Sequence, residues 1–295
     1  MANYIVTAGS CQRKDLYATI VGWLTAAGWT NISSNPVHTT TGDGDVLTSP
    51  GTNGTQKLVL QLRRCNTAPT TEDISLTTNS ANAIYWKMPG DYTPGTAGTN
   101  GTIPANKSGA GATTWGTLYM ASVAVPYDTV INYKYYADAN GVFFSLEYPS
   151  GLAQGPVFNY LMAPATQFSV ETGSRALIVA SSVNNNQGWN TPTVCDYPAT
   201  VGNTAAPAST GSYWVIPPKN PNISNKYALS EFFSGDGNIG IRFKLDGFLV
   251  TTKDGIGNGD IVQIGSSQYY MLIPQQTGGD AFYNGAHPAI ALRIA

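Results

Sequence analysis

Charge is the scarcest property of this 295-residue chain. Only 11% of its residues are Asp, Glu, Lys or Arg, whereas an average globular domain has about a quarter. The formal net charge is −2, so the sequence offers no basic surface of the kind that attracts nucleic-acid phosphates or anionic lipid headgroups. We therefore expect no nucleic acid and no membrane among its partners.

Histidine and cysteine are also rare, and this restricts the chemistry that the chain can perform. A catalytic triad would depend on His38 or His287, and no G-x-S-x-G elbow accompanies them. Cys11, Cys65 and Cys195 lie far apart without a C-x-x-C pair, so no zinc site is predicted. Three cysteines cannot all pair within one chain, and whether one disulfide forms stays open. We therefore expect no nucleophilic hydrolase of the triad type and no cofactor.

Two acidic loops and one apolar stretch have alternative interpretations. "GDGDV" (42–46) and "DGIGNGD" (254–260) resemble pieces of calcium loops, but neither has the glutamate that closes an EF-hand, so we interpret both as β-turns. Residues 12–29 resemble a signal peptide in outline, although Asp15 interrupts the start and the apolar residues follow a helical period. No run of 18 apolar residues occurs, so no membrane-spanning helix is predicted.

What the chain has in abundance is glycine, proline, threonine and aromatic residues. It contains 32 Gly, 18 Pro and 17 Tyr, and 42% of its residues are hydrophobic, which is enough for a large core. Aromatic and β-branched residues favour strands, and Gly, Asn and Pro favour turns. The composition predicts a mainly β fold, an antiparallel β-sandwich with one N-terminal amphipathic helix and a C-terminal β-meander.

The predicted helix covers residues 12–27. Its apolar residues recur along one face at helical spacing, and they are Leu16, Ile20, Trp23, Leu24 and Ala27. Ser10 is the expected N-cap and Gly28 the expected left-handed residue after the C-cap. The opposite face carries Gln12, Arg13, Thr19 and Thr25. Since an apolar stripe needs a partner surface, we expect this helix to lie against a sheet.

Strand patterns fill most of the remaining chain. In "QKLVLQLR" (56–63) Leu58, Leu60 and Leu62 share one face, and Val59 breaks the alternation. Further strands are predicted at 117–125 and 175–183. After a short helical candidate at 226–233, the meander is predicted from five strands, with a tight Asp246-Gly247 turn after the first; they are 238–245, 248–252, 260–264, 268–273 and 289–294. We divide the chain into 1–225 and 226–295, packed on one core.

An aromatic hairpin is the most conspicuous candidate surface. "YKYYADANGVFFSLEYPSG" (133–151) predicts two strands around an Asn140-Gly141 turn. Tyr133 and Tyr135 share one face with Tyr136 on the other, and Phe143 and Phe144 are divided in the same way. Aromatic residues on both faces indicate a strand pair that is covered on both sides, whereas a sugar-binding platform would expose one face. We interpret the hairpin as a packing surface, with a ligand platform as the alternative.

Two long loops, at 89–114 and 184–212, are the predicted contact regions. They consist almost wholly of small and polar residues, and loops of this length in compact domains are usually functional or contact another chain. The large aromatic residues in or beside them are the interface candidates: Tyr92, Trp115, Trp189, Tyr197 and Trp214.

Several quoted segments together resemble a family of structural proteins of tailed-phage virions. They are "AAGWT" at the end of the helix, "DGDVLTSPGTNGTQKLVLQLR", the aromatic hairpin, "RALIVASSV", and the ending "GDIVQIGSSQYYMLIP" followed by "AIALRI". The resemblance covers about 10–65, 118–183 and 245–295. It implies a non-enzymatic particle component of the tail or baseplate, located in the virion, whose partners are its own copies and other tail proteins.

Two other functions stay open at this point. A glycan-binding receptor or tail-spike module would expose Trp86, Trp115, Trp189 or Trp214 beside a groove. A β-rich glycoside hydrolase would use Glu147, the acid inside the aromatic hairpin, with a second acid in a turn.

Overall fold

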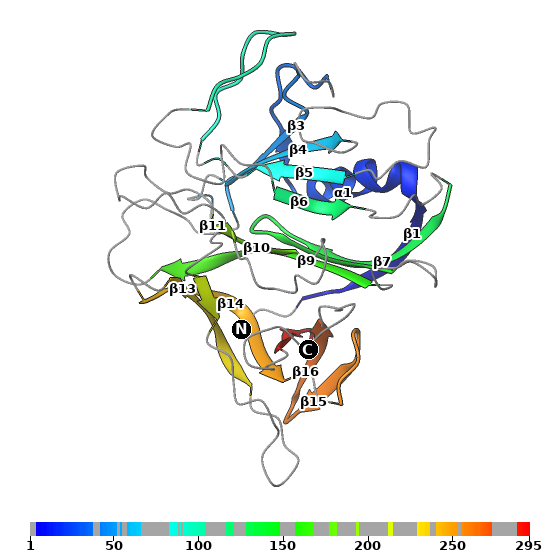
Figure 1. Cartoon of the computed structure of the whole chain (residues 1–295), viewed down its shortest axis with the longest axis vertical. Helices are drawn as coiled ribbons and strands as arrows, with labels where there is room; N and C mark the ends of the chain where they lie inside the picture. Colours follow the sequence, from blue (N-terminus) through cyan, green and yellow to red (C-terminus); the bar gives the residue numbers. More distant parts are fainter. Residues whose placement is uncertain are drawn as a thin grey trace.

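The computed structural model shows a mainly β, antiparallel protein with one short α-helix (Figure 1). Within the described residues there are 17 strands, one 3-10 turn and one α-helix. The structure describes residues 4–37, 42–51, 54, 58–65, 83–87, 89, 91–103, 116–120, 128–147, 157–167, 177–181, 193–194, 212–214, 229–236, 240–252, 255–272 and 288–295.

The predicted N-terminal helix is confirmed as α1 (Leu16–Ala26). The apolar stripe is buried, with Leu16, Ile20 and Leu24 at most 1% exposed. Gly28 has φ +94°, its N–H donates to the Thr25 carbonyl and the Trp29 N–H donates to the Leu24 carbonyl. These two bonds form a Schellman motif, which ends the helix at the expected glycine.

The start of the helix differs from the prediction. Ser10 is not an N-cap, because it lies in strand β1 (Thr7–Gln12) and pairs with Asn132. A 3-10 turn, η1 (Arg13–Asp15), then leads into the helix, so Asp15 takes the capping position without a side-chain cap bond. Arg13, expected on the solvent face, is only 5% exposed. Strand pairing with β7 therefore overrides the local capping signal of the serine.

A five-stranded antiparallel sheet follows the helix, in the order β2-β3-β4-β5-β6. On β4 the predicted leucine face is buried, and Val59 and Gln61 on the other face are also buried. Both faces of β4 are covered, which explains why Val59 breaks the polar-apolar alternation. The strands are β2 (Thr30–Asn31), β3 (Asp45–Ser49), β4 (Leu58–Cys65), β5 (Ala83–Lys87) and β6 (Gly116–Met120).

The larger sheet joins twelve strands along the main order β1-β7-β8-β9-β14-β17-β16-β15. Its N-terminal and C-terminal parts meet where β14 pairs with β9. Side strands β10 and β11 continue from β9, and β12 and β13 continue from β14. The bounds are β7 (Val130–Ala137), β8 (Val142–Glu147), β9 (Val157–Gln167), β10 (Leu177–Ser181), β11 (Thr193–Val194), β12 (Ser212–Trp214), β13 (Ser230–Asp236), β14 (Gly240–Thr252), β15 (Ile261–Ile264), β16 (Ser267–Leu272) and β17 (Pro288–Arg293).

The aromatic hairpin is formed by β7 and β8, but its turn lies one residue earlier than predicted. The Asp138 N–H donates to the Gly141 carbonyl, which places Ala139 and Asn140 at the centre of the turn. Oδ1 of Asp138 accepts the N–H groups of Asn140 and Gly141. An aspartate that caps its own turn in this way displaces the Asn-Gly pair from the central positions.

Two predictions in the C-terminal part are wrong. Residues 230–233 of the helical candidate belong to β13, and Asp246-Gly247 lies within the continuous strand β14. The pairing of β13 with β14 shifts between Glu231 and Phe232, whose partners are Leu249 and Leu245. The Asp-Gly pair therefore lies where the pairing of β13 with β14 is irregular, and glycine is favoured at such a position as it is in a turn.

The predicted strands at 260–264 and 268–273 form a hairpin, but the last strand of the chain lies inside the sheet and not at its edge. β15 and β16 are joined by Gly265-Ser266, with Gly265 at φ +61°. β17 then pairs with both β14 and β16, so the four strands do not lie in chain order. A strand that must close a gap between two others depends on contacts distant in the sequence, which local patterns do not reveal.

One core cluster unites the helix with both sheets. It contains the α1 stripe, leucines of β3 and β4, and apolar residues of β7 and β8 (Figure 1). A second cluster lies under β14, β16 and β17 and includes Leu249, Tyr269 and Met271. The residues of this second cluster all lie within 229–295. Nevertheless β14 pairs with β9, so the C-terminal and N-terminal parts share the larger sheet. The predicted domain boundary at 225 lies outside the described residues.

Candidate functional site

One face of the aromatic hairpin is closed by α1. The Trp23 ring stacks on Tyr135 with 4.3 Å between centroids and an interplanar angle of 10°, and meets Tyr133 at 4.8 Å edge-on. Phe144 lies 5.6 Å from the same ring. Trp23 is 6% exposed, so this face of the hairpin is occupied by the chain itself.

The other face of the hairpin is covered by the N-terminal segment and the C-terminal strands. The Tyr4 ring packs edge-on against Tyr136 at 4.7 Å and lies 5.6 Å from Phe248 of β14. Phe143 lies 6.0 Å from Tyr270 of β16. The predicted division of the aromatic residues between two faces is confirmed, and each face packs against other parts of the chain, with Phe143 and Phe144 buried and the tyrosines half-buried.

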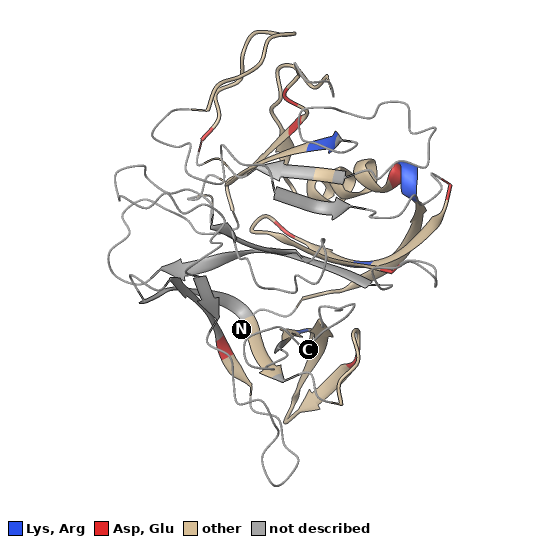
Figure 2. Ribbon diagram, viewed as in Figure 1, with Lys and Arg blue, Asp and Glu red and all other residues tan. Residues whose placement is uncertain are grey.

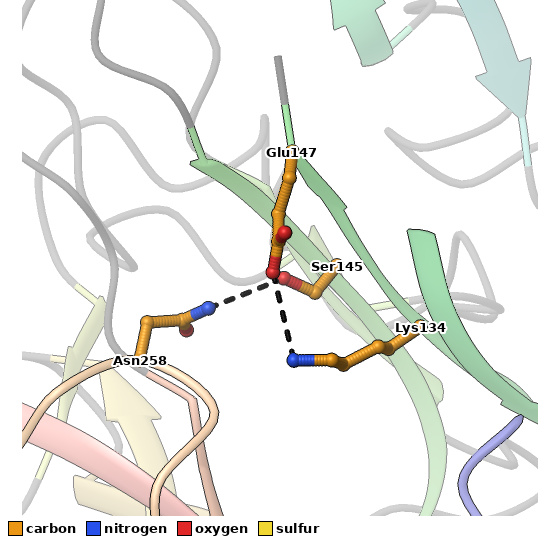
Figure 3. A network of polar contacts seen from close by, with 4 residues as sticks. All are labelled: Lys134, Ser145, Glu147 and Asn258. Carbon is orange, nitrogen blue, oxygen red and sulfur yellow. Dashed lines mark hydrogen bonds and ion pairs between the residues drawn. The ribbon is translucent and has the colours of Figure 1, made fainter. Parts of the chain in front are cut away.

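A polar network lies beside Phe143 on this second face, where β7 and β8 meet the loop before β15 (Figure 3). Lys134 Nζ lies 3.6 Å from Glu147 Oε1, and Asn258 Nδ2 donates to Ser145 Oγ at 3.4 Å. Ser145 is 1% exposed, whereas the Lys134 and Glu147 side chains are 35% and 37% exposed. The network therefore has a buried hydroxyl at its base and an ion pair at its rim.

Tyr270 borders the same network. Lys134 Nζ lies 5.7 Å from the centre of its ring, and the buried Tyr270 hydroxyl has no hydrogen-bond partner among the described residues. Burial, and then the charge of Glu147, raise the pKa of Tyr270 to about 12. A Cβ at Gly259 would lie 3.1 Å from the Tyr270 oxygen and 3.2 Å from Lys134 Nζ, and its φ of +83° also favours glycine.

The network joins the β7–β8 hairpin to the segment before β15. A glycosidase needs two carboxyl groups across a cleft, and the four residues of the network include one, Glu147, already paired with an ammonium group. With a pKa of about 12, Tyr270 is protonated near neutral pH. Within the described part of the chain, no group of three or more His, Cys, Asp or Glu could hold a metal ion.

A second polar cluster fixes the start of the first long loop. Oδ2 of the buried Asp43 accepts the Tyr92 hydroxyl at 2.6 Å and the Gly101 N–H at 2.9 Å. Nε2 of Gln61 donates to the Asp43 carbonyl at 2.6 Å. Charge-assisted bonds to a buried carboxylate are strong, so Asp43 ties both ends of the segment 92–101 to β4. We call Asp43 with these partners the Asp43 clasp.

The segment 91–103 is consequently a structured projection. Thr93 and Thr102 form a two-way backbone bridge, and Ser34 Oγ accepts the Gly95 N–H while donating to the Thr99 carbonyl. Residues 93–100 are all exposed and uncharged. Within the predicted 89–114 loop, residues 93–100 therefore form a solvent-exposed tip that is held in place by hydrogen bonds at its base.

The predicted interface residues have different outcomes. Tyr92 is 3% exposed and belongs to the Asp43 clasp, so its side chain is buried and not at the protein surface. Trp214 ends β12. Trp115, Trp189 and Tyr197 lie outside the described residues. No local sequence pattern predicts Asp43 as an anchor, because its partners Tyr92 and Gly101 are 49 and 58 residues away.

Comparison with known proteins supplies no relative from which a function could be transferred. A scan against protein-family models finds no matching family, and a search of curated proteins finds no match. In the part of the chain that the structure describes, no helix is long and apolar enough to cross a membrane.

Proposed function

We propose that this protein is a structural component of a tailed-phage virion, in the tail or baseplate, and that it acts through contacts between subunits. In this proposal the two sheets are the layers of a β-sandwich built around α1. The partners are further copies of the chain and neighbouring tail proteins, and no step of chemistry is involved.

The observation that carries the proposal is the closure of the aromatic hairpin on both faces. Trp23 fills one side, and Tyr4, Phe248 and Tyr270 cover the other. The hairpin, whose alternative interpretation is a ligand platform, is therefore packed against other parts of the chain. This supports a building block over a binding module or a hydrolase, as does the resemblance of several segments to virion proteins.

The sparse charge of the surface also supports this proposal. Figure 2 shows the Lys, Arg, Asp and Glu positions scattered singly or in pairs along the ribbon of the described residues. A protein surrounded by its own copies needs few charges, since obligate interfaces are large and relatively apolar. The uncharged tip at 93–100 suits such a contact.

The experiment is to measure incorporation of variants into particles made in host cells. Deletion of the whole loop would remove Tyr92 and unbalance the buried Asp43, so a substitution at the exposed tip is cleaner. We expect Ala97→Arg to fold with unchanged stability, because exposed substitutions usually change it by less than about 0.5 kcal/mol. Incorporation should fall sharply.

Ala18→Arg is the matched control, because Ala18 is exposed on α1, away from the loop. It should be incorporated like the unmodified chain. Normal incorporation of Ala97→Arg would show that the tip is not an interface. Particles that never contain the unmodified chain would refute the virion role itself.

A further inference from the structure

Among the strands that the structure describes, β15 is an edge of the larger sheet. It ends the strand order and pairs with β16 along one side, and its apolar residues Ile261 and Ile264 are 60% and 39% exposed. Residues 261–272, which form the hairpin of β15 and β16, include no charged residue. Exposed edge strands usually carry lysine, proline or a bulge that prevents pairing with another chain, and this hairpin has no such protection along Ile261–Ile264.

The hydrogen-bond pattern shows which backbone groups face outward. The Met271 N–H donates to the Asp260 carbonyl, so Asp260 faces β16. In an antiparallel pair, successive residues alternate between facing the partner strand and facing away. Val262 and Ile264 therefore bond toward β16, and the N–H and C=O groups of Ile261 and Gln263 point away from it.

We propose that β15 pairs with β15 of a second copy of this chain, antiparallel and about a two-fold axis at Val262. This deepens the proposed function, on which it rests, because it names one subunit contact. A two-fold axis normal to the sheet pairs residues of the same face. Ile261 of each copy then lies opposite Gln263 of the other copy. Each outward N–H group therefore meets an outward C=O group of the second copy. The edge is self-complementary, as an isologous interface requires.

The side chains fit this register. Val262 packs on the cluster of Leu249, Tyr269 and Met271. In the proposed pair it lies opposite Val262 of the second copy, and each Ile264 lies diagonally from the second copy's Val262 on the same face. Apolar cross-strand pairs stabilise a sheet, so the C-terminal core would continue from one subunit into the next. The loss of exposed Ile264 surface also favours a second copy over a hydrophilic peptide as the occupant.

Disulfide cross-linking of the full chain tests this register. Opposed residues of a pair without direct hydrogen bonds have Cα atoms about 4.5 Å apart, within the range of a disulfide. Val262→Cys should therefore form a covalent dimer on oxidation, with a doubled mass in denaturing conditions. Ile264→Cys is the matched control: it is more exposed and on the same face, yet its counterpart lies about 13 Å along the strand, so no dimer should form.

A proline substitution shows whether the edge itself is responsible. Because the Ile261 N–H points away from β16, Ile261→Pro removes an outward donor and leaves the hairpin bonds intact. Added to Val262→Cys, it should abolish the dimer without changing the unfolding midpoint. Absence of the Val262→Cys dimer at high protein concentration and in particles would overturn the proposal, as would equal cross-linking through Ile264→Cys. Either result leaves incorporation into particles, the test of the virion role, unaffected.

Discussion

Replacement of Trp23 by alanine tests whether the aromatic hairpin is a packing surface. At 6% exposure almost the whole side chain is removed from solvent. A buried tryptophan contributes about 200 Å² at about 25 cal/mol/Å², or about 5 kcal/mol, and large-to-small substitutions of buried Trp typically cost about 3–5 kcal/mol. The stack on Tyr135 lies within the favourable range for aromatic pairs. We expect Trp23→Ala to lower the free energy of unfolding by about 4 kcal/mol.

Urea unfolding followed by circular dichroism measures this loss. Val130→Ala is the control, since Val130 lies on the same strand as Tyr135 but is 52% exposed, and it should cost less than about 1 kcal/mol. A Trp23→Ala loss below about 1 kcal/mol would refute the reasoning, because it would mean that the hairpin face is not closed by α1. The aromatic surface would then be free for a ligand.

Three further predictions concern the polar clusters. Asp43→Asn should weaken the hydrogen bonds from Tyr92 and Gly101 and lower the free energy of unfolding by about 1–3 kcal/mol. Amide hydrogen exchange at Gly101 should become faster, and unchanged exchange would contradict the Asp43 clasp. Because its pKa is raised from about 10 to about 12, Tyr270 contributes stability that is complete below pH 10 and is lost as pH rises through 12. In pH-dependent unfolding, Tyr270→Phe should therefore lose about 2–3 kcal/mol less between pH 10 and 12 than the unmodified chain. An identical pH profile of the two proteins would contradict the burial of this hydroxyl. Glu147→Gln should cost less than about 1 kcal/mol in urea unfolding, because its ion pair with Lys134 is partly exposed, and a larger loss would disprove a rim position.

The sequence was sufficient where a pattern is local. The spacing of Leu16, Ile20 and Leu24 defined the helix, and Gly28 identified its end, since only local geometry decides both. The leucine face of β4, the two-faced aromatic hairpin and the turn at Gly265 were predictable for the same reason.

The sequence was insufficient where distant pairing decides the outcome. Ser10 became part of a strand because β1 pairs with β7, more than a hundred residues away. The Asp246-Gly247 pair lies at a register shift within β14 and not in a turn, because β13 pairs on either side of it. The candidate site shows the same limit, because the network around Lys134 and Asn258 joins segments that no local motif connects.

The position of the chain in intact particles tests the central claim most directly. Electron cryo-microscopy of purified virions should show repeated copies of this fold in the tail or baseplate, with the 93–100 tip and β15 at subunit contacts. Particles in which no density fits the chain, together with a purified chain that stays monomeric and cleaves a polymer, would contradict the account.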